Sequence, residues 1–177
     1  MSNYVYIATS LDGFIATTEG GTEWLEDIPN PEGSDFGFSD FIARVDAILM
    51  GRATFEKVLS FGQWPYTKPV FVLSSRLESV PPELGSKARI VRGELVGVIE
   101  DLTSQGFENL YVDGGRLIQS LLRENLIDEL IITRVPKLLG SGIPLFGELK
   151  QAVEFSHVET EVLENYLVKS RYLKRAH

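Results

Sequence analysis

The sequence of 177 residues contains no cysteine and only two histidines, His157 and His177. Without thiol groups the chain can form neither a disulfide nor a thiolate-ligated metal site. Two isolated histidines also provide too few of the ligands that transition metals prefer, and neither stands in a pattern typical of a Ser-His-Asp triad. We therefore expect no metal in this protein.

Long apolar segments are missing as well. No hydrophobic run comes near the roughly 20 residues that a helix needs to span a bilayer. The N-terminal residues, MSNYVYIATSLDG, do not combine a basic segment with a long apolar run, as a secretory signal would. The sequence predicts a cytoplasmic protein without a membrane segment.

Positive charge is in short supply. The chain has 17 Lys and Arg against 25 Asp and Glu, which gives a net charge of −8. A nucleic-acid-binding protein normally presents a basic face, whereas here the basic residues cluster only in the terminal stretch from Lys169 to His177. Such a cluster is more typical of an exposed closing strand. We therefore expect no nucleic-acid partner.

The rest of the composition is that of an ordinary globular protein, with 44% hydrophobic and 24% charged residues. The length fits one domain of about 100–200 residues. No internal repeat, low-complexity tract or linker divides the chain. We expect a single domain over residues 1–177.

Strand and helix patterns alternate along the sequence. Apolar, β-branched and aromatic runs predict strands at residues 4–9, 46–50, 70–73, 110–112 and 129–135. Apolar residues at helical spacing predict helices near 38–45, 51–59, 95–102 and 117–122, with Gly106 capping the third. Residues 153–162 and 166–173 predict a closing hairpin that turns at Glu164 and Asn165. The predicted fold class is α/β, with a central, mostly parallel sheet, an antiparallel C-terminal edge strand and helices on both faces.

Two segments place glycine and arginine between an apolar strand and a helix. They are Gly51-Arg52 and Gly114-Gly115-Arg116. A helix N-terminus offers unpaired N–H groups that suit a phosphate, and glycine lets the backbone approach it closely. An arginine in the first turn is unfavourable for the helix itself, so it is better explained by a neighbouring anionic ligand. The alternative is an ordinary turn with a solvated arginine.

A third polar segment, Leu73-Ser74-Ser75-Arg76, lies at the end of a predicted strand. Its hydroxyls and guanidinium could hold the phosphate of a ribose, because the arginine fork matches phosphate oxygens. A serine-rich turn at a strand end would look the same. The segment indicates phosphate binding only in combination with the other two segments.

The segments SLDGFIA, DAILMGRATFE, VFVLSSR and LYVDGGRLIQSLL, in this order, resemble the dihydrofolate reductase superfamily. Within it the chain is most similar to the reductase domain of the riboflavin-biosynthesis enzymes, and the segment VPKLLGSGIPLF adds to that similarity. The resemblance runs from Tyr4 to Phe146. It implies a dihydrofolate reductase-like fold, an oxidoreductase that uses NADPH, and a homodimer.

The resemblance also implies where NADPH would bind. Ala8 and Ile15 would frame the nicotinamide, while Arg52 and Arg76 would neutralise the 2′-phosphate. In similar proteins the Gly114–Gly115 peptide is cis, and we carry that expectation over. The residues implied for the pyrophosphate and the adenosine are Gly51, Thr54, Leu73, Ser74, Ser75, Val112, Gly114, Gly115, Arg116, Leu117 and Ile118.

Two carboxylates are candidates for catalysis. Dihydrofolate reductases carry an acid on the helix before the glycine–arginine strand, and Asp35 has the matching distance from Met50. An acid there could protonate a ring nitrogen while hydride reaches the adjacent carbon, but Asp35 would equally suit a helix cap. Asp12 lies in the SLDG turn that lines the substrate pocket in the riboflavin branch, although Asp-Gly is also a favourable hairpin turn. Both alternatives stay open.

The leading hypothesis is an NADPH-dependent reductase that transfers hydride to a small heterocycle. The substrate would be a pyrimidine of the riboflavin pathway similar to 5-amino-6-(5-phosphoribosylamino)uracil, or a pterin. One alternative is a true dihydrofolate reductase. Another, of a different class, is a nucleotide-binding module without catalytic activity.

Overall fold

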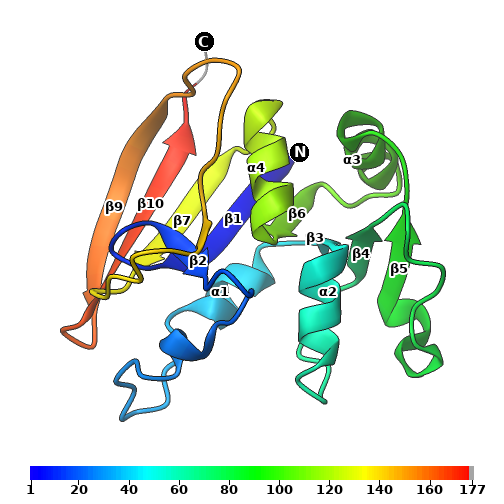
Figure 1. Cartoon of the computed structure of the whole chain (residues 1–177). Helices are drawn as coiled ribbons and strands as arrows, with labels where there is room; N and C mark the ends of the chain where they lie inside the picture. Colours follow the sequence, from blue (N-terminus) through cyan, green and yellow to red (C-terminus); the bar gives the residue numbers. More distant parts are fainter. Residues whose placement is uncertain (176–177) are drawn as a thin grey trace.

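The computed structural model describes residues 1–175, so His177 and the end of the basic C-terminal cluster lie outside the described residues. Strands and helices alternate over most of this length (Figure 1). In chain order the elements are β1 (Ser2–Thr9), β2 (Phe14–Ala16), α1 (Phe38–Ala43), β3 (Ala47–Gly51), α2 (Arg52–Leu59), β4 (Val70–Leu73), β5 (Ala88–Val91), α3 (Leu95–Ser104), β6 (Asn109–Asp113), α4 (Gly115–Arg123), β7 (Glu129–Arg134), β8 (Ile143–Pro144), β9 (Phe155–Leu163) and β10 (Leu167–Lys174).

Eight of the strands form one sheet in the order β5-β4-β3-β6-β1-β7-β10-β9. The first six strands in this order are parallel to their neighbours, whereas β10 runs antiparallel to β7 and β9 antiparallel to β10. Strands β2 and β8 form a small separate pair. The predicted mostly parallel sheet with an antiparallel C-terminal edge is confirmed.

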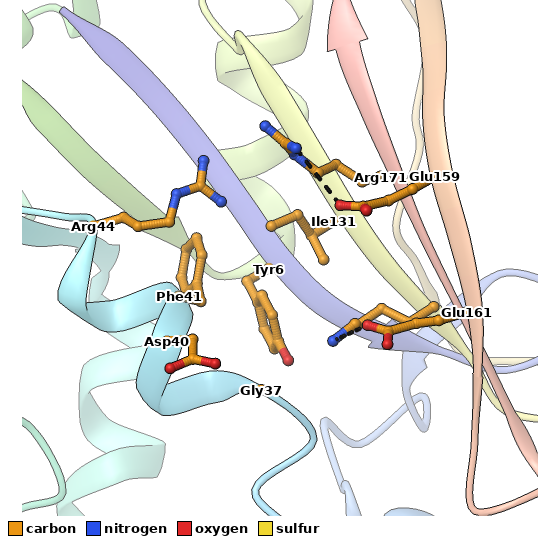
Figure 2. A pocket seen from close by; sticks show the side chains of 10 residues that line it. Tyr6, Gly37, Asp40, Phe41, Arg44, Ile131, Glu159, Glu161 and Arg171 are labelled. Atoms are coloured by element: carbon orange, nitrogen blue, oxygen red, sulfur yellow. Dashed lines mark ion pairs between the residues drawn. The ribbon is translucent and has the colours of Figure 1, made fainter.

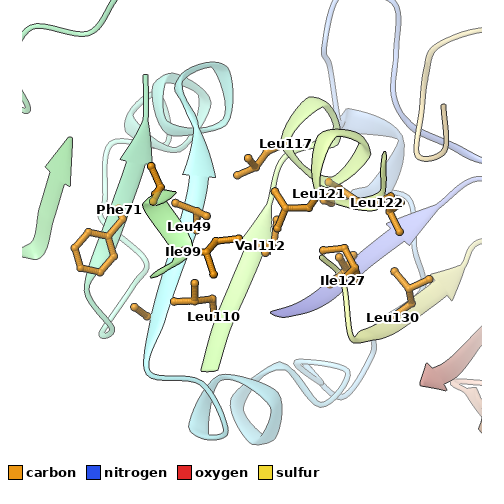
Figure 3. Close-up of a cluster of buried hydrophobic side chains, with 14 of the residues drawn as sticks. Leu49, Phe71, Ile99, Leu110, Val112, Leu117, Leu121, Leu122, Ile127 and Leu130 are labelled. Atoms are coloured by element: carbon orange, nitrogen blue, oxygen red, sulfur yellow. The ribbon is translucent and has the colours of Figure 1, made fainter. Parts of the chain in front are cut away.

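Helices cover both faces of the sheet, and each face has its own core. On one face α3 and α4 pack on strand residues such as Leu110 and Val112 (Figure 3). On the other face one buried cluster contains Phe41 of α1, Phe55 of α2 and Tyr111 of β6. Successive residues of β6 therefore point to opposite faces, as the pleat of a strand requires. The same alternation decides on which face each polar side chain at the strand ends lies.

Two predicted turns have the backbone that their residues favour. Glu164 and Asn165 both have a φ of 52°, which is the left-handed conformation of a two-residue hairpin turn. Gly106 has a φ of 93°, and its N–H donates to Thr103 O at 2.9 Å while Phe107 N–H donates to Leu102 O at 3.0 Å. This pair of bonds is a Schellman motif, so the predicted cap of α3 is confirmed.

The sequence patterns missed three strands. β2 and β8 are three and two residues long, too short for a periodic signal. β5 has the sequence ARIV, in which the exposed Arg89 interrupts the apolar run. In the described part of the chain, no helix is long and apolar enough to cross a membrane.

Candidate active site

Four parallel strands end at one edge of the sheet, and the predicted cofactor-binding segments follow them. The ends of β3, β4, β5 and β6 are Gly51, Leu73, Val91 and Asp113. The register places Gly51 beside Leu73, Leu73 beside Val91, and Met50 beside Asp113. In open α/β sheets, ligands bind in the crevice beyond such strand ends. The structure thus brings together segments that are distant in the sequence.

The first turns of α2 and α4 lie against each other at this edge. A Cβ atom on Gly114 would collide with the side chain of Thr54 in α2, and one on Gly115 would lie 2.5 Å from Cδ1 of Ile15. Gly114 also has a φ of 104°, which glycine tolerates best. These contacts explain why both positions carry glycine. They also place Thr54 and Ile15, two predicted site residues, beside the start of α4.

Neither helix has a side-chain cap. The N-cap residues are Gly51 for α2 and Gly114 for α4, and no side chain accepts from the first turn of either helix. The first N–H groups of each helix are therefore open to an anion. The side chains of Val112, Leu117 and Ile118 are buried in the core, so these predicted site residues can contribute only backbone groups.

The expected cis peptide is not present. Every peptide bond between residues 1 and 175 is trans, including the one between Gly114 and Gly115. The unusual geometry at this position resides instead in the positive φ of Gly114. Our expectation of a cis bond was wrong.

An open hollow of about 430 Å³ lies beyond β4 and β5, beside both helix starts. All four charged side chains in its lining are arginines, which concentrates positive charge in a protein of net charge −8. The complete lining is Arg52, Leu73, Ser74, Ser75, Arg76, Arg92, Gly93 and Arg116. Six of these eight residues were predicted from the sequence to contact a nucleotide.

Arg92 is the arginine that the sequence analysis missed. It follows β5, which was itself missed, and its guanidinium donates to Leu77 O at 2.7 Å. Ser74 Oγ accepts from the N–H groups of Arg76 and Leu77 at 3.2 and 3.0 Å. Arg92 and Ser74 therefore hold the turn that follows β4. The sequence signal that could have identified Arg92 as a site residue is its position directly after the run ARIV. Arg52, which also lines the hollow, forms an exposed ion pair with Glu56 at 3.0 Å.

Ala8 lies near the carboxyl end of β1. It packs in a small cluster with Trp24, Val135 and Leu167 on the α1 side of the sheet. Trp24 is 7% exposed, and its Nε1 atom has no hydrogen-bond partner among the described residues. Ala8 and Ile15 thus stand on the two sides of the strand end that the resemblance assigns to the nicotinamide.

The carboxylate of Asp35 binds backbone groups at the start of α1. Its oxygens accept from Gly37 N–H and Ser39 N–H, each at 2.9 Å. Hydrogen bonds from the Ser39 hydroxyl, and then from these N–H groups, lower the pKa of this exposed carboxyl to about 2. The N-cap residue of α1 is Gly37, but these bonds give Asp35 a structural role at the helix start, as the cap alternative implied. The catalytic role stays a prediction, and an ionised carboxylate does not favour it.

Asp12 joins two loops. Its carboxylate accepts from the Ser10 hydroxyl at 2.6 Å and from the N–H groups of Leu139 and Gly140 at 3.1 and 2.8 Å. The hydrogen bond from Ser10 does most to lower the pKa of this exposed group. Its oxygens are therefore occupied in holding the turn after β1 against the loop after β7. A catalytic role for Asp12 also stays a prediction.

Asp113, the last residue of β6, differs from Asp35 and Asp12 because its pKa is raised instead of lowered. Burial raises its pKa to about 6, although hydrogen bonds from the Tyr66 hydroxyl, Gly114 N–H and the Tyr111 hydroxyl work against the rise. Tyr66 Oη lies 3.3 Å from Asp113 Oδ2. Sequence reasoning treated Asp113 only as part of the glycine motif. An acidic residue directly before a glycine turn at a strand end was the signal that it did not use.

A second cavity, of about 210 Å³, lies between α1 and the C-terminal hairpin (Figure 2). Its cations are already paired with carboxylates. Arg44 and Arg171 lie 3.0 and 2.8 Å from the buried Glu129, and Lys169 lies 2.6 Å from Glu161. This cavity is therefore polar but close to neutral, unlike the arginine-lined hollow. Among the described residues, no group of three or more His, Cys, Asp or Glu could hold a metal ion.

Comparison with known proteins defines the class. The chain belongs to the family described as the RibD C-terminal domain, whose sequence profile matches residues 4–169. The suspected relationship to the riboflavin-biosynthesis reductase domains is confirmed.

Two relatives cover most of the chain. The crystal structure of a putative riboflavin biosynthesis protein from Shewanella sp. PV-4 is 48% identical, with a TM-score of 0.96, and the match covers 99% of this chain and 100% of that one. The uncharacterized protein YwjB of Bacillus subtilis (strain 168) is 39% identical over 155 residues, which is 82% of each chain.

More distant structures share the fold. A diaminohydroxyphosphoribosylaminopyrimidine deaminase/5-amino-6-(5-phosphoribosylamino)uracil reductase from Thermotoga maritima matches with a TM-score of 0.73 and 15% identity, over 98% of this chain and 56% of that chain. A dihydrofolate reductase from Enterococcus faecalis, complexed with NADP(H), matches with a TM-score of 0.65 and 15% identity, over 99% and 97% of the two chains. The predicted dihydrofolate reductase-like fold is confirmed.

Proposed function

We propose that this protein is an NADPH-dependent reductase that transfers hydride to a small heterocyclic substrate. The observation that carries the proposal is the hollow lined by four arginines beside the uncapped N-termini of α2 and α4. Helix N-termini and arginines are the two features that most directly favour bound phosphates. Both occur at the strand ends of a chain that belongs to a family of reductase domains.

The backbone at Gly51 and Gly114 would hold the pyrophosphate. N–H groups of Arg52, Gly115 and Arg116 have no partner within their helices, and the missing Cβ atoms let a phosphate come close. The side chains of Arg52, Arg76 and Arg92, with the hydroxyl of Ser75, would bind the 2′-phosphate of the adenosine. That phosphate is absent from NADH, so these side chains would select NADPH.

The nicotinamide would lie at the carboxyl end of β1, between Ala8 and Ile15. When bound, NADPH supplies the hydride of the reaction. The chain itself would orient the ring through the backbone of β1 and exclude water with the cluster around Trp24, which is buried beside Ala8. The enterococcal dihydrofolate reductase with bound NADP(H) has the same fold, and this supports the choice of cofactor.

The substrate we propose is a pyrimidine similar to 5-amino-6-(5-phosphoribosylamino)uracil, with a pterin as the nearest alternative. The name of the Thermotoga maritima enzyme specifies reduction of this uracil, and the present chain shares its fold and belongs to the RibD C-terminal domain family. The ring would lie on the α1 face of the sheet, next to Ala8 and above Tyr6. We further propose that the protein works in the cytoplasm as a homodimer.

A substrate panel tests this function. Candidate pyrimidines and pterins are mixed with the protein and NADPH, and oxidation is followed as the loss of NADPH fluorescence. We expect oxidation with at least one phosphoribosylated pyrimidine and a much slower rate with NADH. Tight NADPH binding without turnover on any pyrimidine or pterin would contradict the proposed reaction and favour a nucleotide-binding module.

A further inference from the structure

The cavity between α1 and the C-terminal hairpin is separate from the hollow proposed for the cofactor, and the two share no lining residue. Tyr6 of β1 and Ile131 of β7 form its base, while α1 lies on one side and the strands β9 and β10 lie on the other (Figure 2). Its volume is about 210 Å³, whereas sites that enclose a whole drug-sized ligand measure roughly 300–1,000 Å³. The cavity therefore fits one arm of a ligand and not an entire ligand.

This cavity begins where the proposed position of the substrate ring ends. Tyr6 lies two residues before Ala8 on β1, on the same face and about 7 Å away along the strand. Lys169 of β10 stands opposite Thr133 of β7, which itself stands opposite Ala8. Directly opposite side chains share a face, so Ala8, Thr133 and Lys169 form a row of about 10 Å at the usual strand spacing. A substituent on a ring beside Ala8 therefore reaches the cavity without crossing the sheet.

The charged groups that line the cavity balance one another. Three cations and three carboxylates line it, and the buried Glu129 adds a fourth carboxylate that binds Arg44 and Arg171. The third cation, Lys169, pairs with Glu161 at 2.6 Å. Every cation of the lining therefore already has a carboxylate partner. A phosphate in the cavity would lie among four carboxylates and compete with them for these cations, which is unfavourable because like charges repel.

The α1 wall nevertheless keeps groups that can form new hydrogen bonds. Asp40 lines the cavity and has no ion-pair partner among the described residues. Arg44, four residues later on the same face of α1, bonds to Glu129 through Nη2 alone, so the N–H groups of Nε and Nη1 remain available. A hydroxyl group both donates and accepts. Neighbouring hydroxyls of a sugar can therefore bind the carboxylate and the guanidinium at the same time.

We propose that this cavity binds the pentose arm of the substrate through its hydroxyl groups and that the phosphate at the end of the arm is not bound. The proposal rests on the proposed function for its choice of substrate, and it specifies what the site recognises there. The uracil ring lies above Tyr6, and the amino group at ring position 6 carries the pentose into the cavity. The hydroxyls bind Asp40 and Arg44, which are specificity-determining residues, and the phosphate extends past the paired charges into solvent.

Three uracils that differ in the arm test this proposal. They are 5-amino-6-(5-phosphoribosylamino)uracil, the same compound without its phosphate, and 5,6-diaminouracil, which has no arm. Calorimetry with NADP⁺-saturated protein measures their binding without turnover. We expect the first two to bind equally within about fivefold, the most that an exposed ion pair contributes. Without the arm, binding should weaken by about 10–150-fold, the effect of one hydrogen bond to a charged group. A greater preference for the phosphate, or a smaller loss without the arm, overturns the proposal.

Asp40→Ala locates the arm. The residue is exposed and lies in α1, so the variant should keep its fold and its affinity for NADP⁺. We expect it to bind the dephosphorylated compound about tenfold or more weakly and to bind 5,6-diaminouracil unchanged, because the variant and the truncated ligand remove the same interaction. Asp101→Ala is the matched control, since Asp101 is exposed on α3 at the other face of the sheet. If Asp40→Ala weakens both ligands equally, or neither, the arm does not lie in this cavity.

The two proposals fail in different ways. If the protein oxidises NADPH with a pterin but binds none of the three uracils, the reductase function stands and the pentose-arm site falls. If the uracils bind as expected but no pyrimidine or pterin is reduced with NADPH, the pentose-arm site stands and the reductase function falls.

Discussion

At the scale of single residues, the carboxylates of this protein differ in how their oxygens are occupied. Asp35 and Asp12 each accept two or more hydrogen bonds from backbone N–H groups or hydroxyls. Asp113 also accepts a hydrogen bond from Tyr66, at 3.3 Å, but its burial outweighs its hydrogen bonds and raises its pKa to about 6. The first two hold loops in place, whereas burial favours the protonated form of the third.

Asp35→Asn tests the structural role of that residue. An asparagine oxygen can still accept one of the bonds from Gly37 and Ser39, because Asn caps helices about as well as Asp. We expect unchanged NADPH affinity and turnover close to that of the wild type. Steady-state kinetics on the best substrate of the panel provide the measurement. A loss of turnover of a hundredfold or more would restore the catalytic assignment.

At the scale of elements, Gly114 connects β6 to α4 under two constraints. Its φ is 104°, and a Cβ atom would collide with Thr54. We expect Gly114→Ala to lower the free energy of unfolding by about 1–3 kcal/mol and to weaken NADPH binding, since the start of α4 must shift. Denaturant unfolding and calorimetry measure the two effects.

Gly97 offers the matched control for this substitution. It lies inside α3, and a Cβ atom there meets nothing within 4 Å. Gly97→Ala should therefore stabilise the protein by up to about 1 kcal/mol. If both alanine variants had the same stability as the wild type, the constraint at Gly114 would be refuted.

Long elements with a clear period were predictable from the sequence, and so was the antiparallel C-terminal edge of the sheet. The apolar run VFVL at residues 70–73 predicted the strand β4. The helical spacing of four apolar residues, Leu95, Val98, Ile99 and Leu102, predicted the helix α3. Six lining residues of the arginine hollow were named from motifs. Arg92 was not predicted because the strand before it, β5, contains Arg89 and has no long apolar run, so the strand itself was missed.

The raised pKa of Asp113 could not be predicted in the same way. Its pKa depends on burial and on Tyr66, which comes from the segment between α2 and β4 and meets Asp113 only in the folded protein. A sequence pattern records the neighbours of a residue along the chain, whereas desolvation is set by its neighbours in space. The same holds for Asp35, whose hydrogen bonds decide between the two roles that its spacing left open.

At the scale of the whole molecule, one buried carboxylate links α1 to the antiparallel edge of the sheet. Glu129 is 3% exposed and bonds to both Arg44 and Arg171. Burial alone would raise the pKa of Glu129, but hydrogen bonds from Arg171 and Arg44 outweigh it and hold the pKa below 4.5. The contribution to stability is therefore fully present above this value and is lost as the pH falls through the lowered pKa.

Glu129→Gln should remove that contribution. We expect a loss of about 1.5–3 kcal/mol in the free energy of unfolding at neutral pH, because two arginines lose a charged acceptor. The difference between the variant and the wild type should shrink on acidification below 4.5, the ordinary pKa of the group. Urea unfolding over a pH series measures this difference, and a difference independent of pH would argue against the linkage.

The C-terminal hairpin has two unlike faces. Glu159 and Glu161 point to the α1 side, where they meet Arg171 and Lys169. The other face carries uncharged side chains, including Val158, Val162 and Val168 at 42%, 63% and 41% exposure. We predict that this face joins two copies in the homodimer. Sedimentation velocity should give a dimer for the wild type and a monomer for Val162→Asp; a wild-type monomer at micromolar concentration would contradict the prediction.

The central claim is that the arginine-lined hollow selects NADPH. Calorimetric titration of the wild-type protein should show NADPH binding at least tenfold more tightly than NADH, a difference of about 1.4 kcal/mol or more. Arg76→Ala should lose most of this preference by weakening NADPH alone, whereas Arg123→Ala, an exposed arginine in the last turn of α4, should keep it. Equal affinity of the wild type for NADPH and NADH would contradict the account.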